Sequence, residues 1–247
     1  MSETVEKLRN IALVGHGGAG KTSLAEVMLY KAGVTNRIGR VEDGNTLMDF
    51  EPEELKRQSS ISGAFHQLDW KKHTVNIIDT PGDQNFFNDT IFCMQAGDCA
   101  LFLIDGVDGI KVQTEQGWEY AKELNLPSVI FINKLDRERS DFNRTLNEAR
   151  EISDPKPIIV QLPIGKETGF KGIVDLARMK AYTYDANGKA SEIDIPDDMK
   201  DTVEAEREAF IENVAESDDA LIERYLEGEE LTDEDIREAL KKGLLSR

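Results

Sequence analysis

Cysteine and long apolar runs are scarce in this 247-residue sequence. The two cysteines, Cys93 and Cys99, have neither metal-ligand spacing nor the density of a disulfide-stabilised domain. Their apolar neighbours lead us to expect buried, reduced thiols. The longest apolar run, Cys99 to Ile104, is far too short to cross a bilayer, and the N-terminus carries no apolar signal region. From these absences we expect a cytoplasmic protein that has no membrane partner.

Histidine is also scarce, which bears on metal chemistry. The three histidines, His16, His66 and His73, show no spacing typical of a metal site. We therefore expect each of them to be a surface or loop residue.

Acidic residues outnumber basic ones by 48 to 30, and the excess is concentrated late in the chain. Between Asp185 and Glu238 there are 21 acidic and 5 basic residues, which gives this stretch a balance of -16. The remainder is near neutral, so the charge does not argue against a partner that contains RNA. A solvated helical face is the ordinary interpretation of the acidic stretch.

Residues 15 to 22 read G-x-x-x-x-G-K-[ST], the pattern of a phosphate-binding loop. The loop follows the apolar run Ile11 to Val14 and precedes a helix-like segment, Ser23 to Lys31. Its glycines let backbone N–H groups converge on phosphate oxygens, Lys21 reaches the outer phosphates, and Thr22 offers a hydroxyl to Mg2+. The predicted phosphate-binding residues are Gly15, His16, Gly17, Gly18, Ala19, Gly20, Lys21, Thr22 and Ser23. The alternative is a glycine-rich turn that only joins a strand to a helix.

Two later motifs narrow the ligand. The first, Asp79-Thr80-Pro81-Gly82, follows an apolar run; Asp79 can hold the Mg2+ water shell and the Gly82 N–H can face a γ-phosphate. An aspartate at a strand end is also often a cap or turn residue. The second, Asn133-Lys134-Leu135-Asp136, is the N-K-x-D pattern of guanine-binding proteins, in which a carboxylate accepts two N–H donors that adenine does not present together. In this order behind a phosphate loop, the motifs predict a guanine-nucleotide site.

Alternation of strand-like and helix-like segments predicts an α/β fold of the P-loop NTPase type, a mainly parallel sheet with helices on both faces. The predicted strands are 10–14, 63–68, 74–78, 99–104, 128–132 and 157–162, and the predicted helices are 23–31, 86–95, 112–124 and 141–152. Ligands of such sheets bind beyond the carboxyl ends of the strands, where all three motifs lie. The polar stretch 33–62 is longer than an ordinary loop, which suggests a functional or mobile segment.

The residues resemble the translational GTPases, most closely the G domain of bacterial elongation factor G. The resemblance is carried by GHGGAGKTSLAEVMLY, EELKRQSSIS, IIDTPGD, FINKLDRERSDF and the junction from LPIGKE to FKGIVDL, followed by acidic helices. It implies a GTP-binding core over residues 1–163 and a smaller α+β inserted subdomain over 164–247. It also implies that the chain ends before the last core strand, as a truncated piece of a longer factor whose base pocket is looser. Release factor three and the ribosomal-protection proteins are disfavoured by the LPIGKE junction.

The resemblance implies a role for each motif, and at three places this sequence departs from the motifs of the family. Thr22, Ser60 and Asp79 would serve Mg2+, Asn133, Lys134 and Asp136 would hold guanine, and Lys21 would be catalytic. The phosphate loop carries Gly17-Gly18 and the switch carries Gln58-Ser59 where the family has other residues. Where the family has a water-orienting histidine after D-T-P-G, this chain has Asp83. A carboxylate beside a γ-phosphate should hinder phosphoryl transfer, and the neighbouring Gln84 is the candidate substitute.

The expected function is that of a GTPase with GTP or GDP and Mg2+ as ligands, whose hydrolysis is coupled to the ribosome and weak in isolation. The alternative is a GTP-sensing switch that orders a partner surface without hydrolysis. The expected partners are ribosomal RNA and the stalk protein, reached through the full-length factor, and we expect a monomer. These expectations describe a divergent paralogue and not a housekeeping translocase.

Overall fold

The computed structural model describes residues 5–185, 188–216, 218–227, 229 and 231–245, and the chain divides into two compact units. The first unit comprises Met1–Lys134 with Asn143–Ile152, and the second comprises Leu135–Phe142 with Ser153–Arg247. The elements up to residue 152 are, in order, η1 (Val5–Lys7), β1 (Leu8–Val14), α1 (Lys21–Lys31), α2 (Pro52–Arg57), β2 (Ala64–Trp70), β3 (His73–Asp79), η2 (Gln84–Phe86), α3 (Phe87–Gln95), β4 (Cys99–Asp105), α4 (Val112–Glu123), β5 (Ser128–Asn133) and α5 (Phe142–Ile152).

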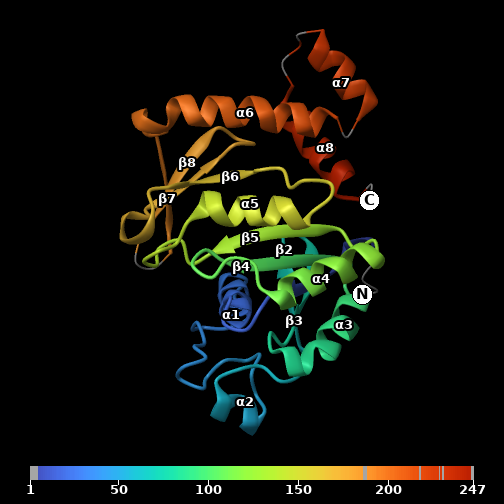
Figure 1. Cartoon of the computed structure of the whole chain (residues 1–247), viewed down its shortest axis with the longest axis vertical. Helices are drawn as coiled ribbons and strands as arrows, with labels where there is room; N and C mark the ends of the chain where they lie inside the picture. The colour runs from blue at the N-terminus through green and yellow to red at the C-terminus, as the bar shows by residue number, and fades with distance from the viewer. Residues whose placement is uncertain (1–4, 186–187, 217, 228, 230, 246–247) are drawn as a thin grey trace. The chain divides into compact units, whose positions relative to one another are not determined.

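The first unit is built on a sheet of five strands in the order β2-β3-β1-β4-β5 (Figure 1). Strands β1, β3, β4 and β5 run parallel, and β2 pairs antiparallel with β3. The predicted α/β fold with a mainly parallel sheet is confirmed. Because β1 lies between β3 and β4, the loop that leaves its carboxyl end has the ends of two further strands beside it.

Alternation along the central strands divides the core into two layers. In β1, Leu13 packs with α1, whereas Ala12 and Val14 pack with α3 and α4. The same alternation places Leu103 on the α1 face and Phe102 on the other, as expected when successive side chains of a strand point to opposite faces. The central strands are therefore apolar on both sides, which is why they appear in the sequence as nearly continuous hydrophobic runs.

The sixth predicted core strand, 157–162, is wrong. The chain forms a strand slightly later, β6 (Gln161–Ile164), and this strand pairs antiparallel with β7 in the sheet of the second unit. A short apolar run shows its extended conformation but not its partner, since pairing is decided by contacts that are distant in the sequence.

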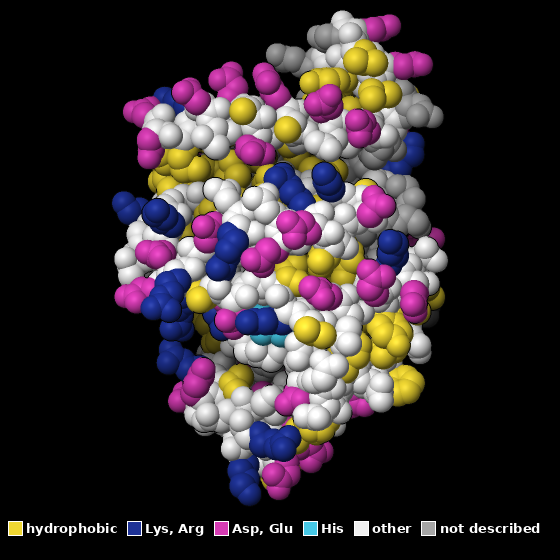
Figure 2. Space-filling view, viewed as in Figure 1, with side chains coloured by type: hydrophobic (Ala, Val, Ile, Leu, Met, Phe, Trp, Pro, Cys, Tyr) yellow, Lys and Arg dark blue, Asp and Glu magenta, His cyan; other side chains and the backbone are white. Residues whose placement is uncertain are grey.

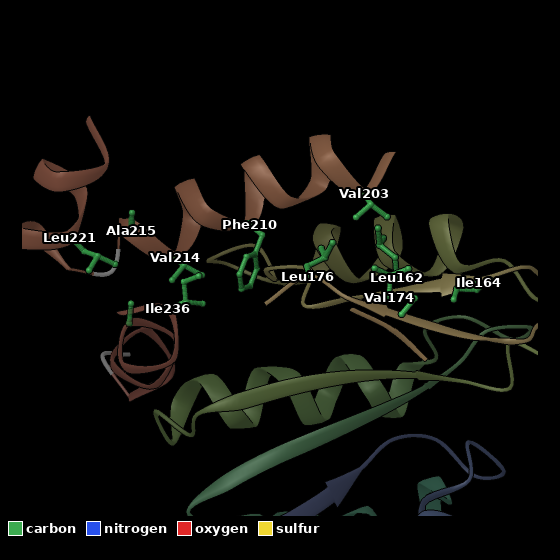
Figure 3. Packing of buried hydrophobic residues seen from close by; sticks show 12 residues of the cluster. Leu162, Ile164, Val174, Leu176, Val203, Phe210, Val214, Ala215, Leu221 and Ile236 are labelled. Carbon is green, nitrogen blue, oxygen red and sulfur yellow. The ribbon is translucent and has the colours of Figure 1, made fainter. Parts of the chain in front are cut away.

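The second unit packs helices against an antiparallel sheet of four strands in the order β6-β7-β8-β9. Its remaining elements are η3 (Glu167–Gly169), β7 (Gly172–Asp175), β8 (Lys180–Tyr184), β9 (Ala190–Ile193), η4 (Asp197–Met199), α6 (Lys200–Ala215), α7 (Asp219–Leu226) and α8 (Asp233–Leu245). Val203, Phe210 and Val214 share one face of α6 and point into a core with Leu162, Val174 and Ile236 (Figure 3). The predicted α+β character of a second, smaller part is confirmed.

Acidic side chains cover the opposite face of α6, as Figure 2 shows along the length of this helix. Glu204, Glu208 and Glu212 are exposed and spaced four residues apart, so they share one side. The predicted start of the last helix is also present: Thr232 Oγ1 accepts from the Asp235 N–H, and Asp235 accepts from the Thr232 N–H. Among the described residues, no helix is both long and apolar enough to cross a membrane.

Candidate functional site

The loop between β1 and α1 carries the predicted phosphate-binding residues. Lys21 begins α1 and is only 6% exposed. Its Nζ donates to the Gly15 and His16 carbonyl oxygens at 2.8 and 3.0 Å, so the side chain curls back along the loop. The loop thus has a buried cation at the N-terminus of a helix, where an anion is favoured. Ser23, two residues into the helix, is exposed.

The loop after β3 lies directly against the phosphate-binding loop. A Cβ added to Gly82 would stand 2.5 Å from both the Gly17 nitrogen and the Lys21 Nζ, so only glycine fits here. Thr80 anchors the loop to β1 by donating to the Leu13 carbonyl at 2.7 Å. Gly82 is therefore brought beside Lys21. That its N–H faces an outer phosphate stays a prediction.

The loop after β5 is hydrogen-bonded to the phosphate-binding loop. Asn133 Nδ2 donates to the Ala19 carbonyl at 2.9 Å, and Lys134 Nζ donates to the Gly18 carbonyl at 2.6 Å. Lys134 Nζ also lies 2.8 Å from Asp105 Oδ2 at the end of β4. Asn133 and Lys134 are thus on the same rim as Lys21. Asp136 belongs to the second unit, and its contact with a base stays a prediction.

A cluster of oxygen atoms lies beside Lys21, where the sequence predicted a magnesium site. Thr22 Oγ1 donates to Asp79 Oδ2 at 2.7 Å, and Ser60 Oγ lies 3.3 Å from Thr22 Oγ1. Ser60 Oγ in turn donates to Asp49 Oδ1 at 2.7 Å. Asp49 was missed by sequence reasoning, because nothing in the stretch 33–62 marks one carboxylate among several as turned inward.

The two carboxylates of this cluster are in an unfavourable environment without a cation. Asp79 and Asp49 are 1% and 3% exposed, and Asp79 Oδ1 and Asp49 Oδ2 have no hydrogen-bond partner among the described residues. Burial raises the pKa of Asp79 to about 7, in spite of Lys21 and the bond from Thr22, and also raises the pKa of Asp49. Burial lowers the pKa of Lys21 to about 8. Mg2+, a hard cation that prefers oxygen ligands, fits these orphaned carboxylate oxygens and hydroxyl groups.

Nucleotide binding that depends on Mg2+ is expected to weaken as the pH falls below about 7. The raised pKa of Asp79 means that a proton competes with the cation for this carboxylate, and the carboxylate becomes largely protonated below that pH. Between pH 8 and pH 6 the affinity for Mg2+-GDP should fall by about tenfold, as expected for one competing proton. Calorimetric titrations at both pH values would test this. Titrations in EDTA are the control, and an equal loss there would contradict the explanation.

Two buried glutamates hold the segment that supplies Asp49 and Ser60. Glu26 of α1 accepts from the backbone N–H groups of Gly39, Leu47 and Met48. Glu54 of α2 accepts from those of Ile61 and Ser62 at 2.9 and 3.1 Å. The predicted functional segment is therefore fixed through its backbone on both sides of the oxygen cluster. Both glutamates lie in segments that carry the family resemblance, Glu26 in GHGGAGKTSLAEVMLY and Glu54 in EELKRQSSIS, but the sequence predicted no role for either.

Asp83 and Gln84, predicted at the hydrolytic side, point to neighbouring helices in this conformation. Asp83 Oδ1 accepts from the backbone and side-chain nitrogens of Asn85, each at 2.8 Å, and so caps η2. Gln84 Nε2 donates to Gln116 Oε1 of α4 at 3.2 Å. Their part in hydrolysis stays a prediction.

Comparison with known proteins identifies the family to which this geometry belongs. The family model described as "Elongation factor Tu GTP binding domain" matches residues 6–227. The chain belongs to this family. It is a translational GTPase G domain, and proteins of this family bind guanine nucleotide, generally with Mg2+.

A solved structure from Thermus thermophilus is similar to this G domain along most of its length. The two have a TM-score of 0.89 and 34% sequence identity over 96% of this chain. This chain spans 36% of that protein, which is therefore considerably longer. The predicted resemblance to translational GTPases is confirmed.

Proposed function

We propose that this G domain is the GTP-hydrolysing part of an elongation factor G-like factor that acts on the ribosome. The observation that carries the proposal is the convergence of three loops: Gly82 packs on the phosphate-binding loop, and Asn133 and Lys134 are hydrogen-bonded to its carbonyl groups. Support for elongation factor G within the family comes from the LPIGKE junction and from the acidic helices of the second unit.

Each loop has a distinct part in the proposed binding of GTP. Backbone N–H groups from Gly15 to Ser23 and the Lys21 ammonium would bind the phosphates. Thr22 and Ser60 would bind Mg2+ directly, with Asp79 and Asp49 holding its water shell, and this ion would neutralise charge on the phosphates. Asn133, Lys134 and Asp136 would bind the guanine base. The proposed partner of the second unit is the ribosomal stalk protein, as the resemblance to elongation factor G implies.

Hydrolysis is proposed to be slow because Asp83 occupies the sequence position at which the family has a histidine that orients the attacking water. Asp83 follows Gly82 directly, and Gly82 is in contact with Lys21. Turning Asp83 towards the phosphate would break its cap on η2 and would place like charges together. The enzyme is therefore proposed to bind GTP well and to turn it over weakly.

Substitution of Asp83 tests this proposal. Asp83→His should raise the single-turnover rate of GTP hydrolysis with ribosomes by about a hundredfold, the usual contribution of a positioned general base. Asp83→Asn, which keeps an oxygen for the cap of η2 and removes only the charge, should raise the rate by about tenfold. Rates would be measured by rapid quench on the GTP-loaded protein.

The matched control is Glu151→Ala, which removes an exposed carboxylate from α5 and should leave the rate unchanged. A fast wild-type protein that neither Asp83 substitution accelerates would refute impaired hydrolysis. Absence of hydrolysis in all variants, with GTP binding intact, would instead support a sensing module that does not turn over GTP.

A further inference from the structure

His16 is a buried histidine whose ring has no hydrogen-bond partner among the described residues. The residue is 5% exposed, and neither Nδ1 nor Nε2 is hydrogen-bonded to any other part of the chain that the structure describes. It lies in a loop, as expected, but it is buried there and not at the surface. A buried polar group without a partner is costly and calls for an explanation such as an ion. Burial lowers the pKa of His16, so its ring is neutral near pH 7 and offers a lone pair.

Two carboxylates face this ring. Asp105 ends β4, and its Oδ1 accepts from the backbone N–H groups of Val107 and Asp108, which forms a tight turn. The turn presents Asp108 to His16, with 3.8 Å between Asp108 Oδ2 and His16 Nε2. One ligand atom from each of the three residues lies within 4.8 Å of the other two. No sequence pattern marks this group, because His16 follows β1 whereas Asp105 and Asp108 lie at and after the end of β4, far along the chain.

The spacing of the atoms suits a metal ion better than a hydrogen bond. A distance of 3.8 Å is too long for a hydrogen bond between Nε2 and a carboxylate. Two ligands of one tetrahedral Zn2+ stand about 3.4 Å apart, because the bonds to nitrogen and oxygen are about 2.0 to 2.2 Å long. A small contraction would therefore place His16 and Asp108 on a shared ion.

We propose that His16, Asp105 and Asp108 bind a divalent transition-metal ion of the Zn2+ or Co2+ type, separately from the magnesium site. The imidazole nitrogen selects such ions over Mg2+ and Ca2+, which prefer oxygen ligands. Asp108 is the accessible ligand, since its side chain is 52% exposed and opens the site to solvent. Asp105 is the third ligand and shares its Oδ2 with Lys134.

Lys111 gives the proposal a directional test. Its Nζ lies 3.6 Å from Asp108 Oδ1, where it competes with a cation for the carboxylate. Removing its charge should therefore tighten metal binding, whereas removing the charge of Asp108 should weaken it. A purely structural role for this cluster predicts no such pair of opposite effects.

The experiment is a titration of the GDP-bound protein with Co2+ in excess Mg2+, followed by visible absorption and by calorimetry. Excess Mg2+ occupies oxygen-only sites on this acidic chain. We expect one Co2+ per chain, displaced by Zn2+. Asp108→Asn should weaken binding by at least about tenfold, and Lys111→Gln should tighten it by about three- to tenfold. His16→Asn, which lies in the phosphate-binding loop, should remove the nitrogen ligand and its spectral signature.

Asp194→Asn, which removes an exposed carboxylate from the second unit, is the matched control and should leave the affinity unchanged. GDP affinity, measured for each variant, establishes that Asp108→Asn and Lys111→Gln are folded. The proposal is overturned if Co2+ does not bind with a stoichiometry of one. It is equally overturned if Asp108→Asn and Asp194→Asn weaken binding alike, or if Lys111→Gln fails to tighten it.

Discussion

Replacement of Lys21 with methionine is expected to lower the affinity for GTP and GDP by about ten- to a hundredfold, because a charged hydrogen bond to a buried phosphate contributes about 1.5 to 3 kcal/mol. Methionine preserves the length and the apolar stem of the side chain. The loss should therefore reflect the missing ammonium group and not a cavity.

The same substitution should not unfold the protein in the absence of nucleotide. The pKa of Lys21 is lowered to about 8, which means that the folded state disfavours the charged form relative to the unfolded chain. The unfolded chain therefore binds more protons between about pH 8 and the ordinary value of 10.5, and stability rises with pH across this window. At pH 7 the ammonium destabilises the empty fold, so the variant should melt no lower than the wild type.

Fluorescent GDP titration and thermal melting without nucleotide would measure both effects. Lys122→Met, on the exposed side of α4, is the control for a loss of one positive charge. Retention of wild-type affinity in Lys21→Met would show that the loop does not bind phosphate through this residue. A melting temperature that falls sharply would show instead that Lys21 has a structural role.

Replacement of Asp136 with asparagine is expected to reverse the base preference of the site. A carboxylate accepts from the N1 and N2 hydrogens of guanine, whereas an asparagine amide presents a donor to the same edge. Xanthine carries an oxygen at that position and can accept from the amide. GDP affinity should fall by about a thousandfold or more and xanthosine diphosphate affinity should rise. A site whose hydrogen-bonding groups match one base binds a base with mismatched donors and acceptors much more weakly.

Competition of both diphosphates against fluorescent GDP would measure the reversal. Asp201→Asn, at the start of α6 and exposed, controls for the loss of one charge. Equal weakening of both nucleotides in Asp136→Asn would show that the residue supports the loop without reading the base. An unchanged preference would show that another group recognises guanine.

Most strands and helices of the first unit could be predicted from the sequence, with the exception of α2 in the polar stretch 33–62. Its central strands are buried on both faces and its helices have one apolar side, so each pattern is local and the predicted ends differ from the observed ones by few residues. The β2–β3 turn was not predicted. Lys71 and Lys72 both adopt positive φ values, of 46° and 68°, where asparagine or glycine would be the usual signal.

The candidate site could be predicted only where a motif marks it. The phosphate-binding loop, Asp79 and Asn133 each follow an apolar strand and carry recognisable neighbours. Asp49 and Glu26 act through contacts outside their own local segments, and each is one of many acidic residues in the sequence. His16 was predicted as part of the phosphate-binding loop, but its proximity to Asp105 and Asp108 depends on residues far along the chain. Their roles depend on which way a side chain turns, which no local pattern records.

The hydrogen bonds that Glu26 and Glu54 accept from the backbone affect which sequence changes this protein can tolerate. Both carboxylates hold main-chain N–H groups, which every residue except proline supplies. Most side chains between Gly39 and Ser62 can therefore change without loss of the hydrogen bonds that hold this segment in place. Insertions or deletions there would slide Asp49 and Ser60 away from Thr22, so this stretch is constrained in length more than in composition.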